Sequence, residues 1–181
     1  MTKNFTIKEF VATGYPEQDT LKERFMLDCL VANLQFIRDE LNTPIFITNT
    51  YRNRSKYLDM LHKGYFPSET SDHFFGQRMP VTNPDKVKKY GKWFDLSCGA
   101  VDFKCADMST SFKKIVQMSK TGYIKTGQLI LEYGNGSQWI HMSNSPDIIY
   151  SAGMAAIIPH RNQYQYSLDG GQNYIEFKEV A

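Results

Sequence analysis

The sequence predicts an α+β protein in which helices pack on a small, mainly antiparallel sheet. Two observations carry this prediction. Residues 20–41 and 109–120 have apolar side chains at helical spacing, and short apolar runs flank glycine-containing turns at residues 134–137 and 169–171. A chain of 181 residues is long enough to bury about two thirds of its unfolded surface. We therefore predict a single domain over residues 1–181.

The composition argues against several classes of function. Lys and Arg number 21 and Asp and Glu number 19, so the net charge is +2, and scattered basic residues do not favour nucleic-acid binding. The cysteines Cys29, Cys98 and Cys105 have no metal-binding or redox spacing, and we expect reduced thiols. No apolar run is long enough for a signal peptide or a membrane span, so we expect synthesis in the cytoplasm without a leader.

The first part of the chain predicts a turn, a long helix and a strand. Thr6 and Glu9 have the spacing of a capping box at the start of a short helical turn. Residues 20–41 predict the main core helix. Its inward side chains are Phe25, Met26, Leu30, Leu34, Ile37 and Leu41. Pro44 ends this helix, and residues 45–48 predict a short buried strand.

The middle of the chain predicts a second helix and an irregular excursion. Residues 55–64 predict a helix with Leu58 and Leu61 facing inward. Residues 78–98 contain two prolines and several lysines without a sustained period. They predict a surface excursion with at most one or two helical turns near residues 84–90.

Residues 99–103 predict a strand with a carboxylate in its apolar middle. Burying Asp102 alone would cost several kcal/mol, so its position requires a cation, a metal or a strong hydrogen-bond partner. Residues 109–120 follow as an amphipathic helix with Phe112, Ile115, Val116 and Ser119 on one side. A strand-rich C-terminal extension over residues 144–181 predicts strands at 147–150, 155–158, 164–168 and 174–177, the last two forming a hairpin.

The hairpin around residues 134–137 groups polar side chains on one face. If Tyr133 pairs with Gln138, then Glu132, Trp139 and His141 project from the same face of the sheet. The core side would then carry Ile140 and Met142. A register slip of one residue would instead move Glu132 to the core face and replace it by Gln138.

Three residues outside the core pattern suit a metal: His73, in a loop-like stretch at 67–76, Asp102 and His141. Two imidazoles and a carboxylate with an open fourth position form a catalytic zinc arrangement. The alternative is that these histidines are hydrogen-bonded structural residues, as we expect for His62 and His160. A purely structural zinc would need a fourth protein ligand, and no candidate is obvious.

The order of these residues carries a family resemblance. The matching segments are Thr50-Tyr51-Arg52, Ser71-Asp72-His73-Phe74-Phe75-Gly76, Ala100-Val101-Asp102, Glu132 and Trp139-Ile140-His141. They resemble the motifs S-G-Y-R, S-x-H-x-x-G, A-x-D, a strand ending in E, and W-x-H of the zinc D-alanyl-D-alanine carboxypeptidase and L-alanyl-D-glutamate endopeptidase family of cell-wall peptidases. Phage-encoded enzymes are among the members of that family. The resemblance spans about residues 5–143.

Two departures from the family pattern concern the site. His73 and Asp102 are 102 − 73 = 29 residues apart, much farther than in the family, so we predict an insertion at about residues 78–99. Several members also carry Glu three residues before the last histidine, where this chain has Gln138, which cannot accept a proton from water. Glu132 is our substitute for that base.

The resemblance implies a fold like that of the hedgehog and D-Ala-D-Ala peptidase domains and a zinc ion on His73, Asp102 and His141. It also implies that Glu132 is the general base, that Arg52 holds a substrate carboxylate or carbonyl, and that Ser71 and Trp139 line the substrate site. The substrate would be a peptidoglycan stem peptide, and the enzyme would act at the cell wall, carried there by a phage lysis system or virion.

Each of these roles has an alternative. Arg52 would otherwise be a surface residue paired with Asp59, Glu132 a solvated strand residue, and Ser71 a loop cap. The whole chain would otherwise be a non-catalytic structural or binding protein that retains the peptidase fold, such as a virion component in contact with other virion proteins.

Overall fold

The computed structural model describes residues 4–10, 21–52, 54–65, 67–68, 71–74, 78–90, 93–95, 99–144 and 163–178. Its centre is a six-stranded sheet with the strand order β1-β4-β6-β5-β7-β8. These strands are β1 (Ile45–Asn49), β4 (Ala100–Cys105), β5 (Thr126–Gly134), β6 (Ser137–Asn144), β7 (Gln163–Ser167) and β8 (Ile175–Glu176). Every neighbouring pair is antiparallel except β5 and β7. The predicted α+β class with a mainly antiparallel sheet is therefore confirmed.

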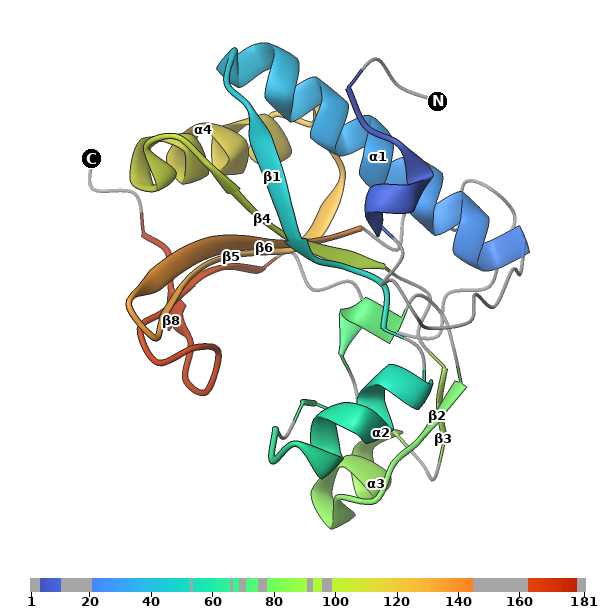
Figure 1. Ribbon diagram of the computed structural model, residues 1–181. Coiled ribbons are helices and arrows are strands. Elements are labelled where there is room, and N and C mark those ends of the chain that lie inside the picture. The colour runs from blue at the N-terminus through green and yellow to red at the C-terminus, as the bar shows by residue number, and fades with distance from the viewer. Residues whose placement is uncertain are drawn as a thin grey trace.

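Two helices pack against one face of this sheet: α1 (Leu21–Leu41) and α4 (Met108–Lys120) (Figure 1). Both match the predicted helices to within one residue. Helix α1 buries Met26, Leu30, Leu34 and Ile37, and α4 buries Phe112, Ile115 and Val116. The sheet contributes Val101, Phe103, Leu129, Leu131, Ile140 and Met142 to the same core. The opposite face of the strands is thus left for polar side chains.

The β5–β6 hairpin has the predicted register. Tyr133 pairs with Gln138, Glu132 with Trp139 and Ile130 with His141. Asn135 and Gly136 both have positive φ, 50° and 71°, which is the conformation that a tight two-residue hairpin turn needs. Because the turn sets this register, the polar side chains of both strands lie on the face away from α1 and α4.

A smaller group of elements lies below the large sheet in Figure 1. It contains α2 (Arg54–His62), the 3-10 turn η2 (Asp72–Phe74), β2 (Arg78–Pro80), α3 (Pro84–Tyr90) and β3 (Trp93–Asp95). Helix α3 confirms the helical turns predicted near residues 84–90. The antiparallel pairing of β2 with β3 was not predicted, because strands of three residues leave no alternating pattern in the sequence.

Two burial predictions are wrong. Successive side chains of β1 point to opposite faces, and only the face with Ile45 and Ile47 is covered by the core. Phe46 points to the other face of this edge strand and is 66% exposed. Leu58 is 44% exposed on α2, and Leu61 is only partly buried. Helix α2 belongs to the smaller group and does not pack into the core formed by α1 and α4, so its apolar positions need not be covered.

The chain ends have mixed outcomes. The capping box is confirmed, since the Thr6 backbone N–H donates to the Glu9 carboxylate at 2.6 Å before η1 (Ile7–Phe10). Strands β7 and β8 form the predicted C-terminal antiparallel pair. The strands predicted at residues 147–150 and 155–158 lie outside the described residues.

Candidate metal centre

His73, Asp102 and His141 come together on the polar face of the sheet. Asp102 of β4 and His141 of β6 are cross-strand partners, and η2 brings His73 beside them. One ligand atom from each residue lies within 4.8 Å of the other two. Asp102 Oδ1 is 2.8 Å from His141 Nδ1 and 3.3 Å from His73 Nε2. The fold thus closes the long sequence gap between the first two residues into a cluster that can hold a metal ion.

The backbone orients the His73 ring. His73 Nδ1 is 2.9 Å from the Thr50 carbonyl oxygen, which can only accept, so Nδ1 carries the proton. Burial lowers the pKa of His73 and favours the neutral ring, although nearby Asp102 opposes this shift. The neutral ring then points the Nε2 lone pair at an Asp102 oxygen. Two facing lone pairs call for a cation between them. In metal sites, a histidine ligand commonly donates its other ring N–H to a backbone carbonyl, as His73 does to Thr50.

Asp102 is bonded on both carboxylate oxygens. Oδ1 faces the two imidazoles, and Oδ2 accepts a hydrogen bond from Asn49 Nδ2 at 3.0 Å. Burial raises the pKa of Asp102, but the two histidines outweigh burial and hold it well below its usual range. The predicted need of this carboxylate for strong partners is confirmed. It stays anionic and is suited to a divalent cation.

The His141 ring has a buried nitrogen that a metal ion or another ligand could bind. Its Nδ1 lies against Asp102, whose hydrogen bond and charge raise the pKa of His141 against the effect of burial. Its buried Nε2 has no hydrogen-bond partner among the described residues. A buried imidazole nitrogen without a partner is costly in a purely structural histidine.

Glu132 lies on the same face, one strand away from His141. Its side chain is only 8% exposed, so the alternative of a solvated strand residue is wrong. Burial raises the pKa of Glu132 to about 7, while the charge of His141 and a hydrogen bond from Trp139 act in the opposite direction. A buried carboxyl group with a pKa near neutrality is suited to general acid–base chemistry.

Arg52 is also buried, at 7% exposure, so the alternative of a surface residue is wrong. Its backbone N–H donates to the His73 carbonyl at 2.8 Å, and its guanidinium lies over the Phe74 ring at 5.9 Å. Its Nη1 donates to Ser71 Oγ at 3.4 Å, and the same oxygen accepts from the His73 backbone N–H. Ser71 therefore braces both the arginine and the histidine turn.

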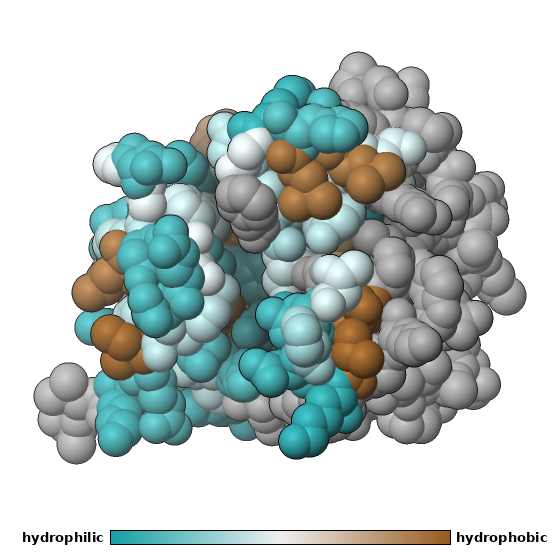
Figure 2. Space-filling view, turned by 90° about the horizontal axis from the view of Figure 1, so that it is seen from below, coloured by the Kyte–Doolittle hydropathy of each residue, from teal (hydrophilic) through white to brown (hydrophobic). Residues whose placement is uncertain are grey.

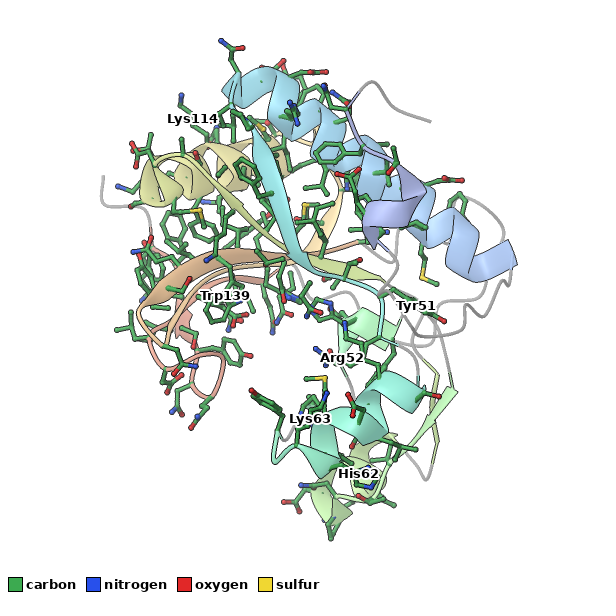
Figure 3. The ribbon with its side chains drawn as sticks, in the orientation of Figure 1. Tyr51, Arg52, His62, Lys63, Lys114 and Trp139 are labelled. Carbon is green, nitrogen blue, oxygen red and sulfur yellow. The ribbon has the colours of Figure 1, made fainter. Side chains whose placement is uncertain are left out.

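These residues line one cleft with a volume of about 1380 Å³. Its lining includes the three residues of the candidate metal cluster and also Arg52, Ser71, Glu132 and Trp139. Figure 3 shows Arg52 and Trp139 on opposite sides of this cleft. Figure 2 shows the same cleft as a hollow in the surface, with hydrophobic residues on both sides. Gln138, at the position of the glutamate in several family members, is exposed and does not line the cleft. Glu132 is the carboxyl group of the hairpin that does line it.

The loop between β7 and β8 contains the turn predicted at residues 169–171, but its place in the candidate site was not predicted. Asp169 organises it by accepting hydrogen bonds from the backbone N–H and the side-chain NH₂ of Asn173, from the Ser167 hydroxyl and from the Gln172 backbone N–H. These bonds lower the pKa of Asp169 to about 2. This loop places Gly171 against Glu132, where an added Cβ would lie 3.0 Å from Glu132 Oε2. The residues Asp169-Gly170-Gly171 predict a turn, but nothing in the sequence indicates that this turn lies beside Glu132.

The other sequence predictions concern residues outside the cluster. His62 is exposed at the end of α2, and His160 lies outside the described residues. Cys29 and Cys105 are free thiols, while Cys98 lies outside the described residues. None of the described helices is long and apolar enough to cross a membrane.

Comparisons with known proteins add no family to this description. No protein-family model, curated protein or solved structure matches the chain. The fold class and the metal-ligand geometry therefore define it as an α+β protein with a candidate metal centre in a cleft.

Proposed function

We propose that this protein is a zinc-dependent peptidase that hydrolyses a peptide bond in peptidoglycan stem peptides. The observation that carries the proposal is the His73–Asp102–His141 cluster with the carboxyl group of Glu132 beside it in an open cleft. The choice of stem peptides, and of a phage-encoded enzyme acting at the cell wall, rests on the resemblance of the sequence motifs.

The donor set favours zinc in a catalytic site. Two imidazole nitrogens and one carboxylate oxygen are typical zinc ligands, and a catalytic site keeps a position open for water or substrate. Among the described residues, the cluster contains no fourth His, Cys, Asp or Glu ligand. A structural zinc would need that fourth ligand, so the composition of the cluster supports catalysis.

The side chains around the cluster have distinct roles in this mechanism. Zinc at such a site supplies Lewis acidity and lowers the pKa of water. Glu132 accepts the proton of the attacking water and returns it to the leaving amine. Arg52 binds a carboxylate or carbonyl of the substrate through its forked N–H groups. Trp139 orients Glu132 through the indole N–H, and Ser71 orients Arg52.

The test combines metal analysis with digestion of peptidoglycan. The purified protein is expected to hold about one zinc per chain and to release stem peptides in a reaction that a chelator stops. His73→Ala is expected to lose both the metal and the activity. The matched control is His62→Ala, because His62 is exposed and outside the cleft. Zinc without hydrolysis would favour the non-catalytic alternative, and no bound zinc would overturn the proposal.

Gly171→Ala is expected to impair hydrolysis without loss of zinc. The new Cβ would lie 3.0 Å from Glu132 Oε2, so the carboxyl group must move. Gly122→Ala is the matched control, because its φ of +82° is close to the +86° of Gly171 but nothing lies within 4 Å of its added Cβ. Both variants place an L-residue in the left-handed region, which costs about 1–2 kcal/mol in each. Equal activities in a peptidase assay would contradict contact between this loop and the base.

A further inference from the structure

One arm of the cleft is lined by three glutamines. Gln128 lies on β5, and Gln163 and Gln165 lie on β7, whose parallel register pairs Gln163 with Gln128 and Gln165 with Ile130. All three side chains are half-buried and line the cleft. Gln128 Nε2 donates to Gln163 Oε1 at 2.9 Å. We refer to these three residues as the glutamine arm.

The alternation of glutamine and tyrosine along β7 places the glutamine side chains on the face that lines the cleft. The strand sequence from residue 163 to 167 is Gln-Tyr-Gln-Tyr-Ser. Tyr164 and Tyr166 are partly buried and pack against the hydrophobic core, where the Tyr164 hydroxyl is hydrogen-bonded to that of Ser119 and Tyr166 contacts Phe112. Since successive side chains point to opposite faces, Gln163 and Gln165 share the face that bears the metal cluster.

The position of the arm sets a minimum length for what it can bind. In the sheet, β7 is two strands away from β6, which carries His141. Two strand spacings amount to about 10 Å, which an extended peptide covers in about three residues. A chain that reacts at the metal cluster must therefore continue for about three residues before it reaches Gln165.

The arm differs in charge from the part of the cleft that carries Arg52. The three glutamines of the arm and the adjacent Ile130 are uncharged, whereas Arg52 has a guanidinium group. Each carboxamide offers both hydrogen-bond donors and an acceptor, which matches the two polar groups of a peptide unit. The carboxylate of a short substrate would find no cation in this arm.

We propose that the glutamine arm binds an uncharged, amide-bearing peptide segment that continues at least about three residues beyond the reacting carbonyl. This inference rests on the proposed peptidase function and assigns the three glutamines to binding the substrate chain away from the reacting carbonyl. A peptide is favoured over a glycan because each carboxamide can pair with both polar groups of a peptide unit. The three residues of the arm include no aromatic ring on which a sugar could stack.

The kinetic test compares two amide-capped peptides that share one scissile bond. One ends at the residues flanking that bond, and the other extends it by three uncharged residues. The wild-type protein is expected to have at least a tenfold higher kcat/KM for the extended peptide, which is about 1.4 kcal/mol of transition-state binding. The Gln163→Ala/Gln165→Ala variant is expected to lose most of that ratio. Gln138→Ala, an exposed glutamine outside the cleft, is the control that keeps it.

A binding measurement separates this inference from the proposed function. In zinc-loaded, ¹⁵N-labelled protein, the side-chain NH₂ signals of the glutamine arm are expected to shift on titration with an uncleavable extended peptide, but not with a capped dipeptide. Shifts without hydrolysis of any substrate would overturn the peptidase and keep the arm. Hydrolysis with no length preference and no shifts would overturn the arm alone. Shifts caused by a peptidoglycan-derived oligosaccharide and not by the peptide would overturn the peptide assignment.

Discussion

Glu132→Gln is expected to lower kcat for stem-peptide hydrolysis by about 10²- to 10⁴-fold, the usual contribution of a positioned general base. Glutamine keeps the size of the side chain but cannot take a proton from water. Since Glu132 is not part of the His73–Asp102–His141 cluster, the zinc content should not change. Elemental analysis and single-turnover kinetics on the same preparation measure both quantities.

The control for this variant is Gln138→Ala on the neighbouring strand. Gln138 is exposed and lies outside the cleft, at the position where several members of the resembling family carry their glutamate. Its truncation is expected to leave hydrolysis unchanged. If Gln138→Ala were the slower variant and Glu132→Gln kept full activity, Glu132 would not be the base.

Asp102→Asn is expected to abolish stabilisation of the fold by zinc. Zinc at a thousandfold excess over its dissociation constant should raise the free energy of unfolding of the wild-type protein by about 4 kcal/mol. Asparagine retains the shape of the side chain but removes the negative charge that faces both imidazoles. Thermal unfolding measured with zinc and then with a chelator should therefore give the same melting temperature for this variant.

The matched control is Asp28→Asn. Asp28 is an exposed carboxylate on α1 that does not line the cleft. It is expected to keep the full rise in melting temperature with zinc. A zinc-dependent rise that persists in Asp102→Asn would show that the ion binds to other residues, and the proposed centre would be wrong.

Local patterns were sufficient for the long elements and for one side of the site. The spacing of Leu30, Leu34 and Ile37 predicts α1, because an apolar face at helical spacing can be recognised without knowing which element packs against it. The turn at Asn135 and Gly136 similarly sets the β5–β6 register through its own backbone conformation. The pairing of residues across a tight turn can be predicted without knowing how the rest of the chain folds. The prediction that Glu132, Trp139 and His141 share one face of the hairpin is therefore correct.

Contacts between distant segments were decided by tertiary structure. His73 reaches Asp102 only because η2 packs beside β4, and the 29-residue separation of the two residues in the sequence does not by itself predict this contact. The burial of Arg52, the exposure of Leu58 and the contact of Gly171 with Glu132 also depend on which elements become neighbours.

The parallel pairing of β5 with β7 gives the clearest contrast. Alternation in residues 163–167 identifies a strand with one polar face, but it carries no information about the partner strand. Hydrogen bonding between backbones is nearly independent of side-chain identity, so many partners are compatible with one local pattern. Sequence thus determines the elements and the faces they bury, while packing of the whole chain decides which polar faces meet in the cleft.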